Sequence, residues 1–255
     1  MPIYRPSELK EFLASIGRGA NASLSQNFLI DGNVLKKMGE LIEPYKNVVE
    51  IGPGPGVLTE ELLNRGVHVT AVEKDAAFAD ALQRFSSPLT VVKGDILDYK
   101  LPSQSVVVGN IPYGISREIC HWLIEQRTKV LAAVMMVQAE FAEKLMAKPK
   151  EEGFGALSLA MQYVFDIKRV IEVSSSCFWP KPKVSSSVIV CSKREPRLND
   201  AQEAWLFNSI AVAFSHRRKK LGTALGIEES DPILSKHVDQ VSLEEWIGIS
   251  KLISR

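Results

Sequence analysis

Val48–Thr59 (VVEIGPGPGVLT) joins a short apolar run to an amphipathic run through three closely spaced glycines. Glycine adopts backbone angles that other residues avoid, so this spacing predicts a sharp turn between a buried strand and a helix. The free backbone N–H groups at the start of a helix point toward any ligand that such a turn approaches. The stretch therefore predicts a strand–loop–helix unit whose loop contacts a ligand closely.

Alternating apolar and amphipathic runs continue along the chain from this loop. The apolar runs predict buried strands at residues 48–51, 67–72, 89–92, 105–108 and 130–137. The helical patterns between them fall at residues 58–64, 76–85, 116–125 and 139–145. Buried strands that alternate with helices indicate an α/β fold with a parallel sheet, right-handed crossovers and helices on both faces.

The pattern changes after Gly155. A helix is predicted at 156–163, and two β-rich segments follow at 166–173 and 184–191, which indicates an antiparallel hairpin at the sheet edge.

The remaining sequence is predicted to be helical to its end, with breaks near Gly226 and Asp231-Pro232. We therefore expect a larger α/β domain over residues 1–193, which begins with an N-terminal arm over residues 1–33. A small all-helical domain is expected over residues 194–255.

The composition is that of an ordinary globular protein, with 45% hydrophobic residues and a formal net charge of +1 over 255 residues. The cysteines, Cys120, Cys177 and Cys191, show no CxxC spacing, so we expect neither a metal site nor disulfides. Since no apolar run is long enough to span a membrane and residues 1–10 lack a signal-peptide pattern, we expect a cytoplasmic protein. With so little net charge, a nucleic-acid surface would have to come from local basic clusters.

Two acidic residues end or follow the next predicted strands, at the same edge of the sheet as the glycine loop. Glu73 stands where doubly wound folds place a carboxylate that accepts hydrogen bonds from a ribose diol. Asp95 follows the third strand, where it could accept a hydrogen bond from an adenine amino group. Val57 occupies the position of the third glycine in a dinucleotide-binding GxGxxG pattern, which disfavours an NAD-linked dehydrogenase. Together these features predict a pocket for a different adenosine-bearing ligand.

Asn110-Ile111-Pro112-Tyr113 follows the fourth strand and is therefore expected to face the same pocket. The Asn110 side-chain oxygen and the Ile111 carbonyl could accept the two N–H bonds of an exocyclic adenine amine, which frees its lone pair for an electrophilic methyl group. Pro112 stiffens the segment, and Tyr113 offers a ring face to the base. Alone, such a tetrapeptide would be interpreted as a plain loop; beside this pocket it predicts methyl transfer to adenine.

These motifs resemble those of class I S-adenosylmethionine-dependent adenine-N6 methyltransferases, most closely the KsgA/RsmA family of ribosomal RNA dimethyltransferases. The resemblance covers nearly the whole chain. It extends to four further segments: Leu24–Leu29 (LSQNFL), Val137–Leu145 (VQAEFAEKL), Phe178–Val184 (FWPKPKV) and Phe214–Leu221 (FSHRRKKL). Ser25 and Ile111 stand where the family usually has Gly and Leu, and both changes are small.

The resemblance implies a Rossmann-like, mostly parallel seven-stranded sheet with an antiparallel edge hairpin, and S-adenosyl-L-methionine as the cofactor. The first domain would bind the cofactor and carry out catalysis, and the helical domain would contact RNA. The cofactor residues that it implies are Gln26, Asn27, Leu29, Glu50, Gly52, Gly54, Gly56, Glu73, Asp95, Ile96 and Asn110. The catalytic residues that it implies are Asn110, Ile111, Pro112, Tyr113 and Phe178, with the target base between the two aromatic rings. Core packing is the alternative role for Phe178.

The implied reaction is the dimethylation of two adjacent adenosines in the 3′-terminal hairpin loop of small-subunit (16S) ribosomal RNA, during ribosome biogenesis. We expect a monomer that acts on the RNA of an assembling small subunit. The expected RNA contacts are Lys181 and Lys183, near the base site, and the consecutive Arg217, Arg218, Lys219 and Lys220. If those four lie on a helix, two or three of them could follow one phosphate track, and a solvated helix face is the alternative.

Two other functions remain open. An Erm-type methyltransferase acting on large-subunit ribosomal RNA shares the pocket, although 214–221 and Val241–Trp246 (VSLEEW) look more like the KsgA side. A catalytically idle assembly or transcription factor on the same fold is the alternative from another class, and the intact Asn110–Tyr113 segment argues against it.

Overall fold

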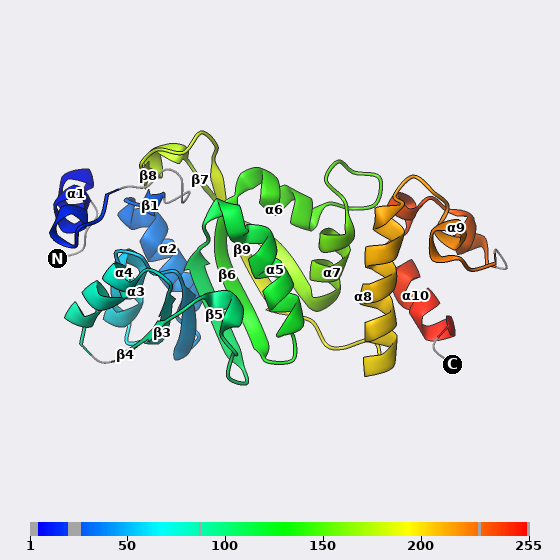
Figure 1. The fold of residues 1–255 in the computed structure, drawn as a ribbon, viewed down its shortest axis with the longest axis horizontal. Helices are drawn as coiled ribbons and strands as arrows, with labels where there is room; N and C mark the ends of the chain where they lie inside the picture. The colour runs from blue at the N-terminus through cyan, green and yellow to red at the C-terminus, as the bar shows by residue number, and fades with distance from the viewer. Residues whose placement is uncertain (1–4, 20–26, 87, 229–230, 254–255) are drawn as a thin grey trace. The chain divides into compact units, whose positions relative to one another are not determined.

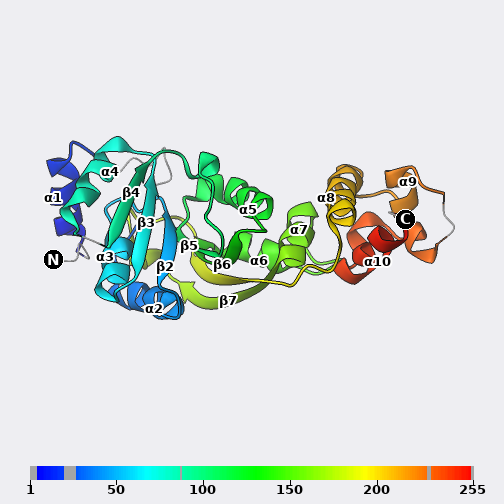
Figure 2. The ribbon, with the colours of Figure 1, turned by 90° about the horizontal axis from the view of Figure 1, so that it is seen from below.

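A computed structural model describes residues 5–19, 27–86, 88–228 and 231–253 (Figures 1 and 2). Contacts between backbone positions divide the chain into two compact units, Met1–Ala142 with Lys168–Ser192, and Glu143–Ile167 with Lys193–Arg255. Residues 143–167, which the sequence-based division assigned to the first domain, therefore belong to the C-terminal unit by these contacts. The functional division at residue 194 stays a prediction.

One seven-stranded sheet has the order β4-β3-β2-β5-β6-β9-β7. The strand bounds are β2 Asn47–Ile51, β3 His68–Glu73, β4 Leu89–Lys93, β5 Ser105–Asn110, β6 Val130–Gln138, β7 Phe165–Val173 and β9 Ser186–Lys193. Strands β2 to β6 pair in parallel, and β9 pairs antiparallel with β6. The predicted mostly parallel sheet is confirmed, and β9 lies between β6 and the edge strand β7.

Helices occupy the connections where amphipathic patterns predict them, and two further helices precede β2, where none was predicted. Their bounds are α1 Pro6–Ser15, α2 Gly32–Ile42, α3 Val57–Asn64, α4 Ala76–Ala81, α5 Ser116–Glu125, α6 Ala139–Met146, α7 Ala156–Val164, α8 Asp200–Ser215, α9 Leu221–Leu225 and α10 Leu243–Ile253. Within the part of the chain that the structure describes, no helix is both long and apolar enough to cross a membrane.

The core beneath the site lies between α2, α3 and one face of the sheet. In α2, the fully buried Leu35, Met38 and Ile42 recur at the three- and four-residue spacing that places side chains on one face of a helix. They pack with strand residues such as Val48 and Val106 in a single cluster. Each such side chain contributes roughly 1.5–3 kcal/mol of hydrophobic stabilisation to the core beneath the site.

A small second sheet joins two segments that are distant in the sequence. Strand β1 (Phe28–Leu29) pairs antiparallel with β8 (Phe178–Trp179), so that Leu29 lies opposite Phe178. Helix α1 belongs to the same region, because its buried Leu9 and Leu13 share an apolar cluster with Phe28. The described parts of the N-terminal arm, residues 5–19 and 27–33, are thus folded against the main body of the first unit.

Helices α7, α8 and α10 of the second unit surround a core that includes the fully buried Trp246. Helix α8 ends at Ser215 and α9 begins only at Leu221, so the basic run 217–220 lies in the turn between them. The prediction of a continuous helix through this run is therefore wrong. The chain reverses there because the Lys219 N–H donates to the His216 carbonyl (2.8 Å) after the helical ladder has ended.

Candidate active site

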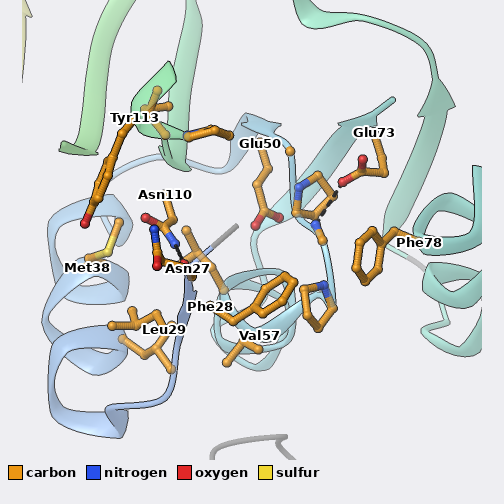
Figure 3. Close-up of a pocket in the computed structure, with 18 residues that line it drawn as sticks. Asn27, Phe28, Leu29, Met38, Glu50, Val57, Glu73, Phe78, Asn110 and Tyr113 are labelled. Carbon is orange, nitrogen blue, oxygen red and sulfur yellow. Dashed lines mark hydrogen bonds between the residues drawn. The ribbon is translucent and has the colours of Figure 1, made fainter. Parts of the chain in front are cut away.

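A pocket opens at the carboxyl ends of β2 and β5 (Figure 3). These strands are neighbours in the sheet, and the strand order runs outward in opposite directions from them, toward β3 and β4 on one side and β6 on the other. In open α/β sheets this point of reversal is where ligands bind, because the loops on either side diverge and leave a crevice. The glycine loop therefore borders the same cavity as residues 110–113.

The pocket brings together most of the predicted site residues. Those that line it are Asn27, Leu29, Glu50, Gly52, Gly54, Glu73, Asn110, Ile111, Pro112 and Tyr113. Predicted residues that do not line it are Gly56, Asp95, Ile96 and Phe178. Gln26, also predicted, lies outside the residues that the structure describes.

The glycine loop turns through left-handed backbone angles, with φ of +56° at Gly52, +54° at Gly54 and +78° at Gly56. Only glycine adopts such angles without strain. A side chain at Gly56 would also lie 2.7 Å from both Leu82 and Phe85. Gly56 therefore caps the start of α3 and lets it pack closely. It does not line the pocket, and its contact with the cofactor stays a prediction.

Glu50 is a buried carboxyl group in the pocket wall, with 1% of its surface exposed. Its Oε2 accepts a hydrogen bond from the Thr59 hydroxyl (2.7 Å). Burial raises the pKa of Glu50 to about 8, since the charged form loses its hydration. An acidic group kept largely neutral in this way becomes charged when a cation binds beside it.

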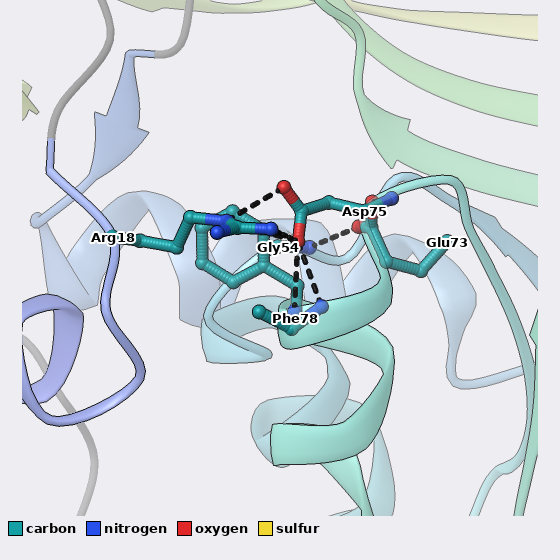
Figure 4. A network of polar contacts seen from close by, with 6 residues as sticks. Arg18, Gly54, Glu73, Asp75 and Phe78 are labelled. Atoms are coloured by element: carbon teal, nitrogen blue, oxygen red, sulfur yellow. Dashed lines mark hydrogen bonds and ion pairs between the residues drawn. The ribbon is translucent and has the colours of Figure 1, made fainter.

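Glu73 ends β3 and accepts a backbone hydrogen bond on each of its oxygens (Figure 4). The Gly54 N–H donates to Oε2 (2.9 Å) and the Asp75 N–H donates to Oε1 (2.8 Å). Burial nevertheless raises the pKa of Glu73. Because each carboxylate oxygen carries two lone pairs, the group can still accept hydrogen bonds from a ligand in the pocket.

Asp75 connects this carboxylate to the N-terminal arm. Its Oδ1 accepts from the N–H groups of Ala77 and Phe78 at the start of α4. Arg18 donates to both Asp75 oxygens, with Nε 2.9 Å from Oδ2 and Nη2 3.0 Å from Oδ1 (Figure 4). The hydrogen bond from Arg18 holds the pKa of Asp75 below its usual range. Arg18 was not identified from the sequence, since no local pattern connects it to Asp75.

Asp95 follows β4 beside Glu73, where the Gly94 N–H donates to the Glu73 carbonyl (2.9 Å). Its Oδ2 is paired with Lys74 Nζ (2.8 Å) and its Oδ1 accepts from the Leu97 N–H. The hydrogen bond from Lys74 lowers the pKa of Asp95. Asp95 thus lies near the pocket but outside its lining, and its expected contact with adenine stays a prediction.

Asn110, at the end of β5, has a fixed side-chain orientation. Its Nδ2 donates to the Asn27 carbonyl (2.9 Å), which leaves Oδ1 as the acceptor end of the amide. Asn27 was expected to contact the cofactor. The structure shows a further role for it, since its backbone holds the amide of Asn110 in place.

The two residues that follow Asn110 are also anchored. The Ile111 N–H donates to the Met136 carbonyl on β6 (3.0 Å), and Ile111 is 1% exposed. Tyr113 is half-buried, and its hydroxyl lies 2.7 Å from Ser186 Oγ. Burial raises the pKa of the Tyr113 phenol, so it is neutral at physiological pH.

Phe178 does not contribute a ring to the pocket in this structure. It is 2% exposed and packs in the same core cluster as Leu29, which lies opposite it across the β1–β8 pair. In this structure Phe178 is therefore a core residue, which was the alternative role expected for it. Its role in base stacking stays a prediction that requires the ring to move.

The apolar wall of the pocket was missed from the sequence. It includes Phe28, Leu35, Met38 and Phe78, whose side chains come from β1, α2 and α4. The rings of Phe28 and Phe78 meet edge to face with centroids 5.9 Å apart. A helical apolar stripe in α2 was the available signal, but it indicates core packing equally well.

The lining of the pocket favours a cationic, partly apolar ligand. Two acidic side chains, Glu50 and Glu73, face it, and among the described residues no lysine, arginine or histidine lines it. A pyrophosphate would lack any cationic side chain to pair with, whereas a sulfonium or ammonium group would be stabilised by the carboxylates. The residues present therefore fit S-adenosylmethionine, which carries both cations on an adenosine.

The predicted RNA-contacting residues are all on the surface. Lys181 and Lys183 are exposed in the loop after β8 in the first unit. Arg217, Arg218, Lys219 and Lys220 are exposed in the second unit, where Arg217 lies 3.7 Å from Asp239. Over the described ranges, no three His, Cys, Asp or Glu side chains come together in a way that could hold a metal ion.

A family model described as "Ribosomal RNA adenine dimethylase" matches residues 17–252. A relative from Protochlamydia amoebophila is 36% identical over 88% of this chain and 84% of its own length. Another, from Deinococcus radiodurans, is 37% identical over 86% of this chain and 77% of its own length. Both relatives are named ribosomal RNA small subunit methyltransferase A.

Solved structures share the fold. The 23S rRNA methyltransferase ErmE is 28% identical with a TM-score of 0.71, covering 90% of this chain and all of its own. A dimethyladenosine transferase from Plasmodium falciparum gives a TM-score of 0.73 at 23% identity, covering 86% of this chain and 94% of its own. At 23% identity, the similarity to the Plasmodium falciparum structure supports the fold alone.

Proposed function

The chain belongs to the ribosomal RNA adenine dimethylase family, and we propose that it methylates the N6 amines of two adjacent adenosines in small-subunit ribosomal RNA, with S-adenosylmethionine as donor. The observation that carries the proposal is one pocket that joins two buried carboxyl groups to Asn110–Tyr113. The choice of small-subunit RNA is supported by relatives of that name at 36–37% identity, against 28% for the 23S enzyme.

The cofactor half of the pocket consists of the glycine loop, Glu50 and Glu73. When bound, S-adenosylmethionine supplies an electrophilic methyl group on a sulfonium. The free lone pairs of Glu73 would accept hydrogen bonds from the ribose hydroxyls, and the loop lets the backbone approach the ligand closely. Glu50 would provide negative charge near the cationic end. The apolar side chains of Leu29 and Met38, which also line the pocket, would help to exclude water from it.

The target half of the pocket consists of Asn110 to Tyr113. Asn110 Oδ1, oriented by the Asn27 carbonyl, would accept one N–H of the target amine, and the Ile111 carbonyl would accept the other. These bonds draw the nitrogen lone pair out of conjugation with the ring and toward the methyl group. The Tyr113 ring would stack on the base.

The chemical balance of the reaction requires no strong base. In each round the target nitrogen, held by Asn110 and the Ile111 carbonyl, would take the methyl group as its bond to the donor sulfur is lost, and the nitrogen would then carry a positive charge. Its proton is acidic enough to pass to water, which restores a neutral amine for the second round. Asn110 Oδ1 holds the departing proton in its hydrogen bond until water accepts it.

Phosphate contacts would be made by the exposed Lys181 and Lys183 of the first unit and by the basic turn 217–220 of the second. In the turn, all four side chains of 217–220 are exposed and available for such contacts. The proposed substrate places the enzyme in the cytoplasm, as a monomer acting on an assembling small subunit.

The test is a methylation assay with labelled S-adenosylmethionine and under-methylated small ribosomal subunits, followed by nucleoside analysis. We expect label in N6,N6-dimethyladenosine at two adjacent positions near the 3′ end of the RNA. Large subunits and fully methylated small subunits serve as parallel controls and should remain unlabelled. Label in large-subunit RNA alone, or no label in any RNA, would reject the proposal.

A further inference from the structure

The hydroxyl of Tyr113 is bound by a side chain that no motif of the pocket contains. Ser186 Oγ lies 2.7 Å from the Tyr113 hydroxyl, and either atom can donate the proton. Ser186 is 1% exposed and is the first residue of β9. A buried hydroxyl with one well-placed partner loses that hydrogen bond without compensation from water when the partner is removed.

The sheet holds Ser186 in register with the pocket. Asn110 pairs with Met136 across β5 and β6, and Gln138 pairs with Ser186 across β6 and β9. Because β9 runs antiparallel, its first residue lies at the edge where β5 and β6 end. The Ala139 N–H also donates to the Ser185 carbonyl (3.0 Å), so the backbone on both sides of this point is fixed.

The bond to Ser186 completes a set of three anchors on residues 110–113. The other two, from Asn27 to the Asn110 amide and from Met136 to the Ile111 N–H, fix the hydrogen-bonding atoms. The Tyr113 hydroxyl is at the far end of the side chain, so its bond to Ser186 restrains the χ1 torsion, which swings the whole ring. Ser186 therefore sets where the ring lies beside the pocket.

The neighbouring serine provides an internal comparison. Ser187 is also fully buried, but neighbouring residues of a strand face opposite sides of the sheet. Within the described part of the chain, its hydroxyl has no hydrogen-bond partner. Burial in β9 does not by itself require a bonded serine, so the pairing of Ser186 with Tyr113 is specific to the side of the sheet that bears the pocket.

We propose that Ser186 is a positioning residue, which holds the Tyr113 ring in the place where it receives the target base. The proposal rests on the proposed function of the pocket, because it gives Tyr113 the role of base platform. The effect is expected on the RNA substrate and not on the cofactor, since Ser186 does not line the pocket itself.

The first test is a double-mutant cycle in the full-length protein, with Ser186→Ala, Tyr113→Phe and both together. Each single change removes the same hydrogen bond and keeps the ring, so each should lower kcat/KM for the RNA by about fivefold, the factor expected for one ordinary hydrogen bond. The double variant should be no slower than either single variant. Ser187→Ala is the matched control and should match the wild type, and the dissociation constant for S-adenosylmethionine should change less than twofold throughout.

The second test requires no RNA and remains decisive if a variant is poorly active. In protein with carbon-13 at the tyrosine ring carbons, the Tyr113 signal is the one of five that Tyr113→Phe removes. It should shift in Ser186→Ala and stay in place in Ser187→Ala. An unmoved signal, additive losses in the cycle, or wild-type kcat/KM in a folded Ser186→Ala protein would overturn the proposal. If the wild type methylates large-subunit RNA instead, the proposed substrate is wrong, and the same cycle on that RNA still decides the role of Ser186.

Discussion

The two halves of the pocket are held together in different ways. In the cofactor half, the hydrogen-bond partners are close in sequence: Glu73 and Gly54 are 19 positions apart, and Glu50 and Thr59 are nine apart. In the target half they are distant: Asn110 and Asn27 are 83 positions apart, and Tyr113 and Ser186 are 73 apart. The bonds to the two cofactor carboxyl groups thus join positions within residues 50–75, whereas those of the target half join segments from across the first unit. The two functions should therefore be separable by mutation.

The largest effect is expected for Asn110→Ala. This change removes the acceptor that polarises the target amine, so turnover should fall by roughly 100-fold or more, as for the loss of other preorganised polar groups. The affinity for S-adenosylmethionine should stay within about twofold, because the carboxylates of the cofactor half are untouched. Single-turnover methylation and calorimetric titration measure the two quantities separately.

The control for this change is Asn208→Ala, at an exposed position of α8, which should behave as the wild type. A comparable loss of turnover and of cofactor affinity in Asn110→Ala would contradict the separation of the two halves. Asn110 would then belong to the cofactor half as well.

An intermediate effect is expected from pH through Glu50, whose pKa burial raises to about 8. Below that pH the carboxyl group is largely protonated, and a cationic ligand that favours the charged form must expel the proton. The affinity for S-adenosylmethionine should therefore increase by about tenfold between pH 7 and pH 9. Titration in buffers of different ionisation enthalpy would count the released proton.

Glu50→Gln cannot ionise, so its binding should be nearly independent of pH over this range. An equally steep pH dependence in that variant would assign the proton to another group. The raised pKa has an opposite consequence for the unliganded protein, because the folded state then holds a proton that the unfolded chain releases. Its stability should decrease as the pH rises from about 4.5 toward 8.

The smallest effect is expected for Arg18→Ala, which removes the long-range contact of the cofactor half. Asp75 keeps its bonds to the N–H groups at the start of α4, and its own N–H still reaches Glu73. The affinity for S-adenosylmethionine should decrease by threefold at most, at about 50 mM salt, and the difference should vanish at about 1 M, where exposed ion pairs are screened.

Arg5→Ala is the matched control, because Arg5 is exposed and pairs with Glu8 within its own helical turn. It should leave cofactor affinity unchanged at every salt concentration. A loss of tenfold or more in Arg18→Ala would show that the N-terminal arm is part of the binding site, and the cofactor half would then depend on distant chain as the target half does.

The sequence predicted the sheet well because each strand and helix carries its own periodic pattern. The strands expected at 48–51 and 130–137 are found at Asn47–Ile51 and Val130–Gln138. The position of β9 between β6 and β7 was not predictable, since no periodicity records which strands become neighbours. The break in the helix at the basic run was missed because four consecutive charged residues show no periodicity.

The same distinction applies to the site. Glu50, Glu73 and Asn110 were identified because each stands at the end of a strand beside a recognisable loop, and all three line the pocket. The contacts of Arg18 and Ser186 were missed because they join segments that no local pattern relates. Local motifs predict which side chains face the pocket, and the tertiary structure determines which of them are oriented by hydrogen bonds from distant segments.

The place of β9 in the sheet also fixes an order of assembly during synthesis. Strands β2 to β6 can pair as they leave the ribosome, but β7 adjoins only β9 in the described sheet and β9 is made after it. The edge of the sheet therefore closes only when residues 186–193 have emerged. Ser186 belongs to that strand, so a nascent chain would form its glycine loop first and the Tyr113–Ser186 hydrogen bond last.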